Sequence, residues 1–178
     1  MRAVLISIRP EWVEKILSGE KTLEIRKTRP KLETPFKCYI YCTKNEKDSD
    51  RLWVLREQIR KEYDGLSAVC AHLRAQPDLH SVGNGYVVGE FVCDTYVADK
   101  TFGHDTLFNA AACMNESDVV AYSAGTPLYG WHISGLKVYD NPLELTAFRK
   151  PELPTGLRYE EDTIKRPPQS WCYVEELT

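Results

Sequence analysis

The sequence lacks Cys-x-x-Cys pairs and long hydrophobic runs. Its six cysteines are scattered through 178 residues without a Cys-x-x-Cys pair, which argues against a disulfide framework and against a standard zinc site. No apolar segment approaches the length of a membrane span, and the run that follows Met1 is too short for a signal peptide. We therefore expect a cytoplasmic protein with reduced thiols, no metal, no other cofactor and no membrane partner.

The motifs of several enzyme classes are also missing. There is no Gly-x-Ser-x-Gly nucleophile turn, no Gly-x4-Gly-Lys phosphate loop and no Gly-x-Gly-x-x-Gly dinucleotide motif. His132 could serve as a base, but a lone histidine in a strand is more often a packing or surface residue. Cys38 and Cys42 are roughly 13 Å apart on a strand, too far for one zinc ion, so we expect both in the core.

An excess of positive charge is absent as well. The formal net charge of −3 excludes a protein that is basic throughout and coats nucleic acid, although it leaves room for a local basic patch. With 43% apolar and 28% charged residues, the composition is that of an ordinary globular domain. The length predicts one domain over residues 1–178, with a helical insert at about 44–82 and an irregular C-terminal arm at about 140–178.

Hydrophobic periodicity predicts more strands than helices. Strands are expected at 2–8, 22–27, 36–43, 86–98, 128–139 and 171–174, and helices at 10–17, 106–112 and 116–122. Pro10 is expected to begin the first helix and Gly19 to end it. Gly89 indicates a bulge in the strand at 86–98, and Asp140-Asn141-Pro142 is expected to end the strand at 128–139. The pattern favours a mainly β protein with helices, of the α+β class, whose antiparallel or mixed sheet can close into a small barrel.

One short stretch, Gly19 to Arg26, gathers a lysine, a hydroxyl, a carboxylate and a guanidinium group. Alternation places Thr22, Glu24 and Arg26 on one face of the strand. Arg26 offers a planar set of donors for a phosphate or a base edge, and Glu24 can accept from an exocyclic amine. From spacing alone, a solvated charged face with a surface salt bridge is slightly favoured over a binding site.

The pattern Gly19-x-Lys21-x-x-Glu24-x-Arg26 resembles the GxKxxExR signature of ASCH domains, which belong to the PUA-like superfamily. The segments that share this resemblance are Ser7-Ile8-Arg9-Pro10, the helix ending at Leu17, Val87–Phe91 and Tyr129–Ile133, the last of which resembles phage- and prophage-type members. The resemblance covers residues 2–43 and 83–139, and it leaves the insert and the tail outside the generic domain.

This resemblance implies a small PUA-like β-barrel with a cleft whose rim carries Lys21, Glu24 and Arg26. It also implies binding of RNA, a nucleotide or a modified nucleoside. The candidate ligand-binding residues are Lys21, Thr22, Glu24, Arg26, Ser7, Arg9, Tyr41 and Tyr129. Tyr39, Tyr41, Tyr129 and Trp131 are aromatic residues that could stack on bases, with core packing as the alternative, above all for Trp131.

Two other functions stay open. Some ASCH proteins are amidohydrolases of N4-acetylcytidine and at least one is a reported nuclease, so a metal-independent hydrolase of a modified nucleoside or of RNA is one alternative. In it, Glu24 would be the general base, Lys21 would stabilise the oxyanion and Arg26 would hold the substrate. The amidohydrolases carry a nucleophilic threonine at the position of Glu24, so in this chain Thr22 would have to act as the nucleophile instead. Because of this difference we rank binding above hydrolysis.

The remaining alternative is a phage-encoded protein-interaction module. In that case the insert at 44–82 would be the partner surface, and the sequence indicates no particular partner.

Overall fold

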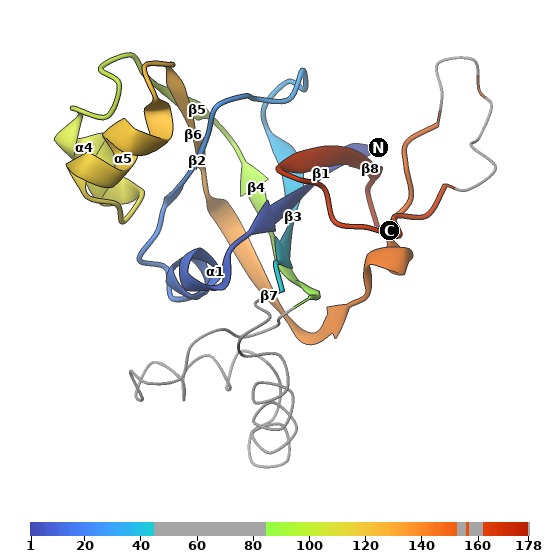
Figure 1. Ribbon diagram of the computed structural model, residues 1–178. Coiled ribbons are helices and arrows are strands. Elements are labelled where there is room, and N and C mark those ends of the chain that lie inside the picture. Colours follow the sequence, from blue (N-terminus) through green and yellow to red (C-terminus); the bar gives the residue numbers. More distant parts are fainter. Residues whose placement is uncertain (45–84, 153–155, 157–161, 178) are drawn as a thin grey trace, which may run out of the picture.

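The computed structural model describes residues 1–44, 85–152, 156 and 162–177 (Figure 1). The elements in these ranges are β1 (Arg2–Ile8), α1 (Pro10–Leu17), β2 (Leu23–Arg26), β3 (Phe36–Cys42), β4 (Val87–Cys93), β5 (Tyr96–Asp99), α4 (Thr106–Ala111), α5 (Glu116–Ser123), β6 (Leu128–His132), β7 (Ser134–Leu143), the 3-10 helix η1 (Leu145–Ala147) and β8 (Trp171–Glu175). The expected helical insert at 44–82 lies, apart from Lys44, outside the described residues.

The strands form two sheets. One sheet has the order β7-β4-β3-β1-β8 and the other the order β2-β6-β5. Only the β1–β3 pairing is parallel among the named strand pairs of the described chain. The chain passes from the first sheet to the second between β4 and β5, and returns between β6 and β7. Each of the single strands expected at 86–98 and 128–139 is therefore divided into two strands, at the point where the chain crosses between the sheets. The expected α+β barrel class is confirmed.

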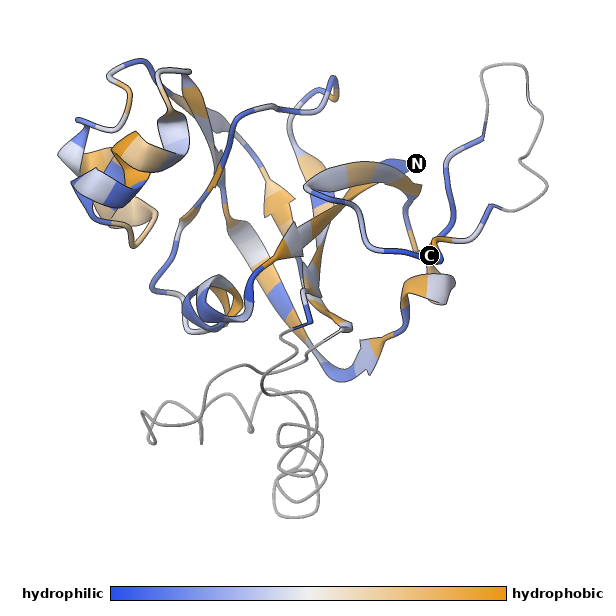
Figure 2. Ribbon diagram, in the orientation of Figure 1, coloured by the Kyte–Doolittle hydropathy of each residue, from blue (hydrophilic) through white to orange (hydrophobic). Residues whose placement is uncertain are grey.

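The core lies on both faces of the five-stranded sheet, and hydrophobic residues concentrate on its central strands (Figure 2). Val4, Ile6 and Ile8 of β1 pack into one cluster with Trp131 at its centre, whereas Leu5 packs into a second cluster. The expected alternation along β1 is therefore confirmed. Cys38 and Cys42, both fully buried in the first cluster, confirm the prediction that these cysteines pack as small apolar side chains.

The unit from β1 to β2 forms as the sequence predicts. Pro10 is the first residue of α1, where its missing N–H is not needed, and Val13 and Ile16 bury the inner face of the helix. Gly19 ends the helix with φ of +79°, a conformation that residues with a Cβ atom rarely adopt. The turn then brings the Lys21 amide to the Lys15 carbonyl at 2.9 Å, which places Lys21 just before β2.

Two helices, α4 and α5, cover the outer face of the three-stranded sheet (Figure 1). Asp105 caps α4, and Asn115 caps α5 by accepting from the Asp118 amide at 2.8 Å. Phe108 and Val119 pack with Leu23 and Ile25 of β2 in a third cluster. We call residues 106–123 the α4–α5 lobe.

The expected end of a strand at Asp140-Asn141-Pro142 is wrong, because β7 continues to Leu143. β7 is the edge strand of its sheet, and a proline is tolerated there since one side of the strand needs no donor. The pairing of β4 with β7 shifts register between Val87 and Gly89, which agrees with the bulge expected at Gly89. After β7, Phe148 and Ile164 pack into the second cluster, so the described parts of the C-terminal segment contribute to the core.

Candidate functional site

A cleft of about 870 Å³ opens beside β2. Its lining comes from the end of β1, from α1, from β2 and the residues after it, from the α4–α5 lobe, and from residues 167–170. The ionisable residues of this lining are Arg9, Glu11, Lys21, Glu24, Arg26, Lys27 and Asp118, so cations exceed carboxylates by one. The cleft is therefore locally more basic than the chain as a whole, whose formal net charge is −3.

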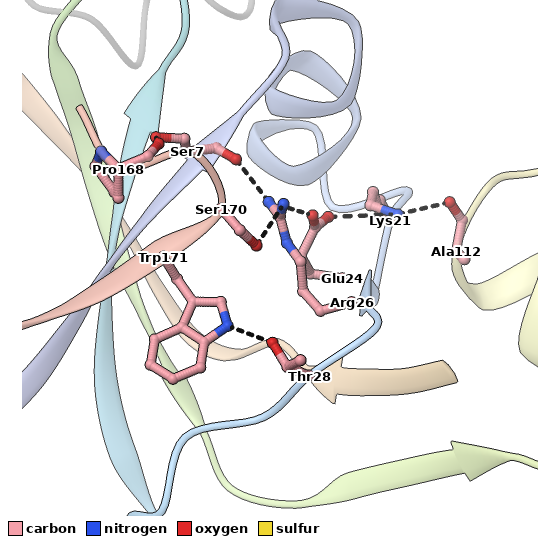
Figure 3. A network of polar contacts seen from close by, with 9 residues as sticks. All are labelled: Ser7, Lys21, Glu24, Arg26, Thr28, Ala112, Pro168, Ser170 and Trp171. Carbon is pink, nitrogen blue, oxygen red and sulfur yellow. Dashed lines mark hydrogen bonds and ion pairs between the residues drawn. The ribbon is translucent and has the colours of Figure 1, made fainter. Parts of the chain in front are cut away.

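Three of these residues form a continuous chain of ion pairs in the cleft wall (Figure 3). Arg26 Nη2 lies 2.9 Å from Glu24 Oε1, and Lys21 Nζ lies 3.6 Å from Glu24 Oε2. The alternation of β2 places Glu24 and Arg26 on the same face, as the sequence predicts. Lys21 and Glu24 are buried and Arg26 is half-buried. We call Lys21, Glu24 and Arg26 the ion-pair chain; their burial argues against the solvated charged face that spacing alone favoured.

Arg26 also connects the ion-pair chain to the opposite sheet (Figure 3). Its Nη2 donates to the Ser7 carbonyl at 2.6 Å, and its Nη1 donates to Ser170 Oγ at 3.4 Å. Ser7 Oγ in turn donates to the Pro168 carbonyl at 2.7 Å, which fixes the segment that forms one wall of the cleft. Arg26 Nε is buried and has no hydrogen-bond partner among the described residues.

Lys21 sits at the other end of the ion-pair chain and is only 2% exposed. Its Nζ donates to the Ala112 carbonyl at 2.8 Å and lies 5.2 Å from the centre of the Trp12 ring. Burial lowers the pKa of Lys21 below its ordinary value, and the neighbouring Glu24 carboxylate opposes part of this effect.

The cleft lining also includes aromatic rings and exposed cations. Trp12 of α1 and Tyr122 of α5 both line it. Lys27 Nζ lies 5.3 Å from the centre of the Tyr122 ring, and the Arg9 side chain is 77% exposed. Sequence reasoning missed both aromatic residues as site residues. For Trp12 the available signal was its place at the margin of the apolar stripe of α1; for Tyr122 the sequence offered none.

The structure brings together five of the eight residues expected to bind a ligand. Ser7, Arg9, Lys21, Glu24 and Arg26 line the cleft, whereas Thr22, Tyr41 and Tyr129 do not.

The three residues that do not line the cleft each have another environment. Thr22 Oγ1 faces the Ala111 carbonyl at 3.5 Å. Tyr41 is 2% exposed in the second core cluster, and Tyr129 lies beneath Arg29, whose guanidinium carbon is 5.8 Å from the centre of its ring.

The other aromatic candidates and the histidine noted in the sequence lie elsewhere too. Tyr39 and Trp131 are fully buried, so the core-packing alternative applies to both. His132 Nδ1 lies 2.6 Å from Asp94 Oδ1 in a pair that is exposed to solvent, which agrees with a surface role.

The arrangement of the two sheets, between which the chain crosses, is that of a PUA-like barrel. Within that class the chain has the ASCH fold. The ASCH protein of Zymomonas mobilis superposes with a TM-score of 0.58 at 17% identity, over 98% of this chain and 88% of that one. A tyrosine-to-phenylalanine variant of it gives 0.58 at 16%, over 98% and 91%, and a serine-to-alanine variant gives 0.55 at 17%, over 98% and 89%. No protein-family model and no curated protein matches the sequence.

Proposed function

We propose that the cleft binds a nucleotide unit, either of single-stranded RNA or as a free nucleotide. The observation that carries this proposal is the buried ion-pair chain in the wall of a cleft that is also lined by aromatic rings and exposed cations. The ASCH fold supports RNA binding in general terms. A cytoplasmic location, and the resemblance to phage- and prophage-type members, belong to the same proposal.

The chemistry of the cleft suits a nucleotide in three respects. Its volume falls within the range of roughly 300–1,000 Å³ that small ligands occupy. Trp12 and Tyr122 offer ring faces on which a base can stack. Arg9 and Lys27 are exposed and can contact a phosphate, whereas the small excess of positive charge matches a short strand better than a long duplex.

The ion-pair chain has a supporting role in this proposal. Both oxygens of Glu24 already face cations of the same chain, at 2.9 and 3.6 Å. A pre-paired carboxylate of this kind gives the cleft a rigid wall and can still offer its remaining lone pairs to an exocyclic amine. Arg26 Nε, which is buried without a described partner, is a further donor close to such a ligand.

Hydrolysis ranks second for a geometric reason. An amidohydrolase of this type needs its nucleophile in the cleft, but Thr22, the substitute nucleophile, faces the Ala111 carbonyl and does not line the cleft. A protein-interaction role would rest on residues 44–82, of which the structure describes only Lys44.

Fluorescence anisotropy with a short labelled oligouridylate tests the binding proposal, with unlabelled uridine monophosphate and uridine as competitors. We expect Lys27→Gln and Arg9→Gln each to weaken RNA binding and to lower the slope of log affinity against log salt by about 0.7. Lys100→Gln is the matched control, because Lys100 is exposed but does not line the cleft. Absence of RNA and nucleotide binding, or an equal effect of Lys100→Gln, would contradict the proposal.

A further inference from the structure

Lys21 joins the cleft to the α4–α5 lobe through the C-terminal end of α4. Ala112 is the residue that caps α4, and its carbonyl accepts from Lys21 Nζ at 2.8 Å. The preceding carbonyl, of Ala111, accepts from the Thr22 amide at 2.9 Å. The last carbonyls of a helix have no partner within the helix, and a cation near them is favoured by the helix dipole. Lys21 and Thr22, the two residues just before β2, therefore donate hydrogen bonds to the free carbonyls at the end of α4.

The lobe that is held in this way supplies one wall of the cleft. Met114, Asp118 and Tyr122 all belong to it and all line the cleft. The distance from Tyr122 to the rings and charges across the cleft therefore depends on how the lobe sits against β2. The lobe is held by the packing of Leu23, Ile25 and Leu128 and by the Lys27 ammonium group over the Tyr122 ring. The Lys21 and Thr22 hydrogen bonds add polar contacts between the end of α4 and the residues that precede β2.

Lys21 has little freedom to contact a ligand itself. It is 2% exposed, and its ammonium group faces the Ala112 carbonyl, the Glu24 carboxylate and the Trp12 ring. An ammonium group has three N–H donors, so these neighbours account for its donor directions. Arg9 and Lys27, by contrast, are exposed on the same cleft.

We propose that Lys21 is a positioning residue that docks the α4–α5 lobe, and with it Tyr122, against the ion-pair chain, without contacting the ligand. This inference rests on the proposed nucleotide-binding function for its effect on affinity. The docking itself is a property of the free protein. Because coupling between sites is reciprocal, a ligand held between Trp12 and Tyr122 must also stabilise the docked lobe.

The test compares Lys21→Met with Arg9→Gln in the full chain by hydrogen exchange, and with Lys27→Gln by RNA anisotropy. Methionine retains the length and apolar stem of Lys21 but removes its donors. Without ligand, we expect amides of residues 106–123 to exchange about tenfold faster in Lys21→Met, as loss of a charge-assisted hydrogen bond predicts. Exchange of these amides should be unchanged in Arg9→Gln, because Arg9 lines the cleft but pairs with Glu11, outside the lobe. Lys21→Gln, which keeps a shorter donor, should give an intermediate acceleration.

The salt dependence of RNA binding separates positioning from direct contact. Lys21→Met should weaken binding of the oligouridylate while leaving the salt slope as in the unchanged protein, whereas Lys27→Gln should lower that slope by about 0.7. Saturating RNA should slow exchange in residues 106–123 in the unchanged protein and less so in Lys21→Met. A lowered slope with unaltered lobe exchange in Lys21→Met would overturn the inference.

Failure of the two proposals can be told apart. If the unchanged protein binds no RNA or nucleotide, the proposed function fails, and lobe exchange in the free Lys21→Met protein still decides the docking role. If RNA binds but lobe exchange is the same in Lys21→Met and in the unchanged protein, only the positioning inference fails. Global unfolding of Lys21→Met would be recognised by fast exchange in β1 and β3 as well, and the milder Lys21→Gln then carries the comparison.

Discussion

Arg26 in β2 donates to the main-chain carbonyl of Ser7 in β1 at 2.6 Å, so one side chain connects the two sheets of the barrel. The same guanidinium pairs with Glu24 at 2.9 Å. Arg26 therefore has two roles in the cleft lining: it joins the two sheets, and it holds the Glu24 carboxylate in place.

Replacement of Arg26 by methionine should lower the free energy of unfolding by about 3 kcal/mol, because removal of one partner leaves the buried Glu24 without its closest counter-charge. Urea unfolding measures the change. Arg149→Met is the control, since the Arg149 side chain is 57% exposed in its pair with Asp162 and an exposed pair contributes about 1 kcal/mol or less. Equal losses in the two variants would show that the Arg26 pair is not effectively buried.

Trp12 and Tyr129 should differ in their effect on RNA binding. Trp12→Ala removes a ring that lines the cleft and should weaken binding about tenfold or more, as expected for the loss of one stacked base. Tyr129→Ala should leave the affinity unchanged, because Tyr129 does not line the cleft. Anisotropy gives the affinities, and urea unfolding checks that both variants are folded. A larger loss of affinity in Tyr129→Ala than in Trp12→Ala would show that RNA binds at Tyr129, as the sequence suggested, and not in the cleft.

Gly130 tests whether lobe position controls the cleft from a distance. A Cβ atom at Gly130 would lie 2.8 Å from Phe108 Cε2 and 3.2 Å from Leu23 Cδ1, so Gly130→Ala should displace the lobe from β2. We expect a loss of about 1–2 kcal/mol in stability and weaker RNA binding.

The control for Gly130→Ala is Gly125→Ala, where φ is +75° and nothing lies within 4 Å of an added Cβ. It should cost roughly 1 kcal/mol through backbone strain without moving the lobe. RNA affinity that falls equally in the two variants would argue against control of the cleft by lobe position.

Alkaline pH should destabilise the protein through its buried thiols. Burial raises the pKa of Cys93 to about 12 and also raises the pKa of Cys38 and Cys42. Thiols of the unfolded chain ionise near pH 8.5, so above that pH the unfolded state binds fewer protons and stability falls as pH rises. The loss should reach about 2 kcal/mol per thiol near pH 10.

Urea unfolding at about pH 7.5 and about pH 10 measures this loss. Cys93→Ala should recover about a quarter of the difference or less, because burial also raises the pKa of Cys38, Cys42 and Cys172, and that of several tyrosines. The prediction is wrong if the free energy of unfolding is the same at both pH values, or if Cys93→Ala leaves the pH dependence unchanged.

The sequence predicted the elements that local periodicity defines. The segment from β1 to β2 could be predicted because Pro10 and Gly19 mark the ends of a short amphipathic helix and alternation orients Glu24 and Arg26. The partners of those side chains could not, because Ser170 lies 144 residues after Arg26 in the chain. No pattern within one segment indicates such a contact.

The errors at Tyr41 and Pro142 have a common physical origin in sheet position. Both faces of β3 are covered, one by the first core cluster and the other by the second, so Tyr41 packs with Phe148 instead of lining the cleft. Pro142 lies in the edge strand β7, where the missing donor is tolerated. Alternation within a strand shows which residues share a face, but only the tertiary structure shows what covers that face.

Photo-crosslinking of a short oligouridylate that carries 5-iodouridine, followed by mass-spectrometric mapping of the adducts, shows directly whether a base stacks in the cleft. A base bound there lies against Trp12 or Tyr122, so we expect adducts on one or both of these residues that unlabelled RNA competes away. Adducts confined to Tyr129 or Tyr173, outside the cleft lining, or the absence of any adduct that responds to competitor, would contradict binding in the cleft.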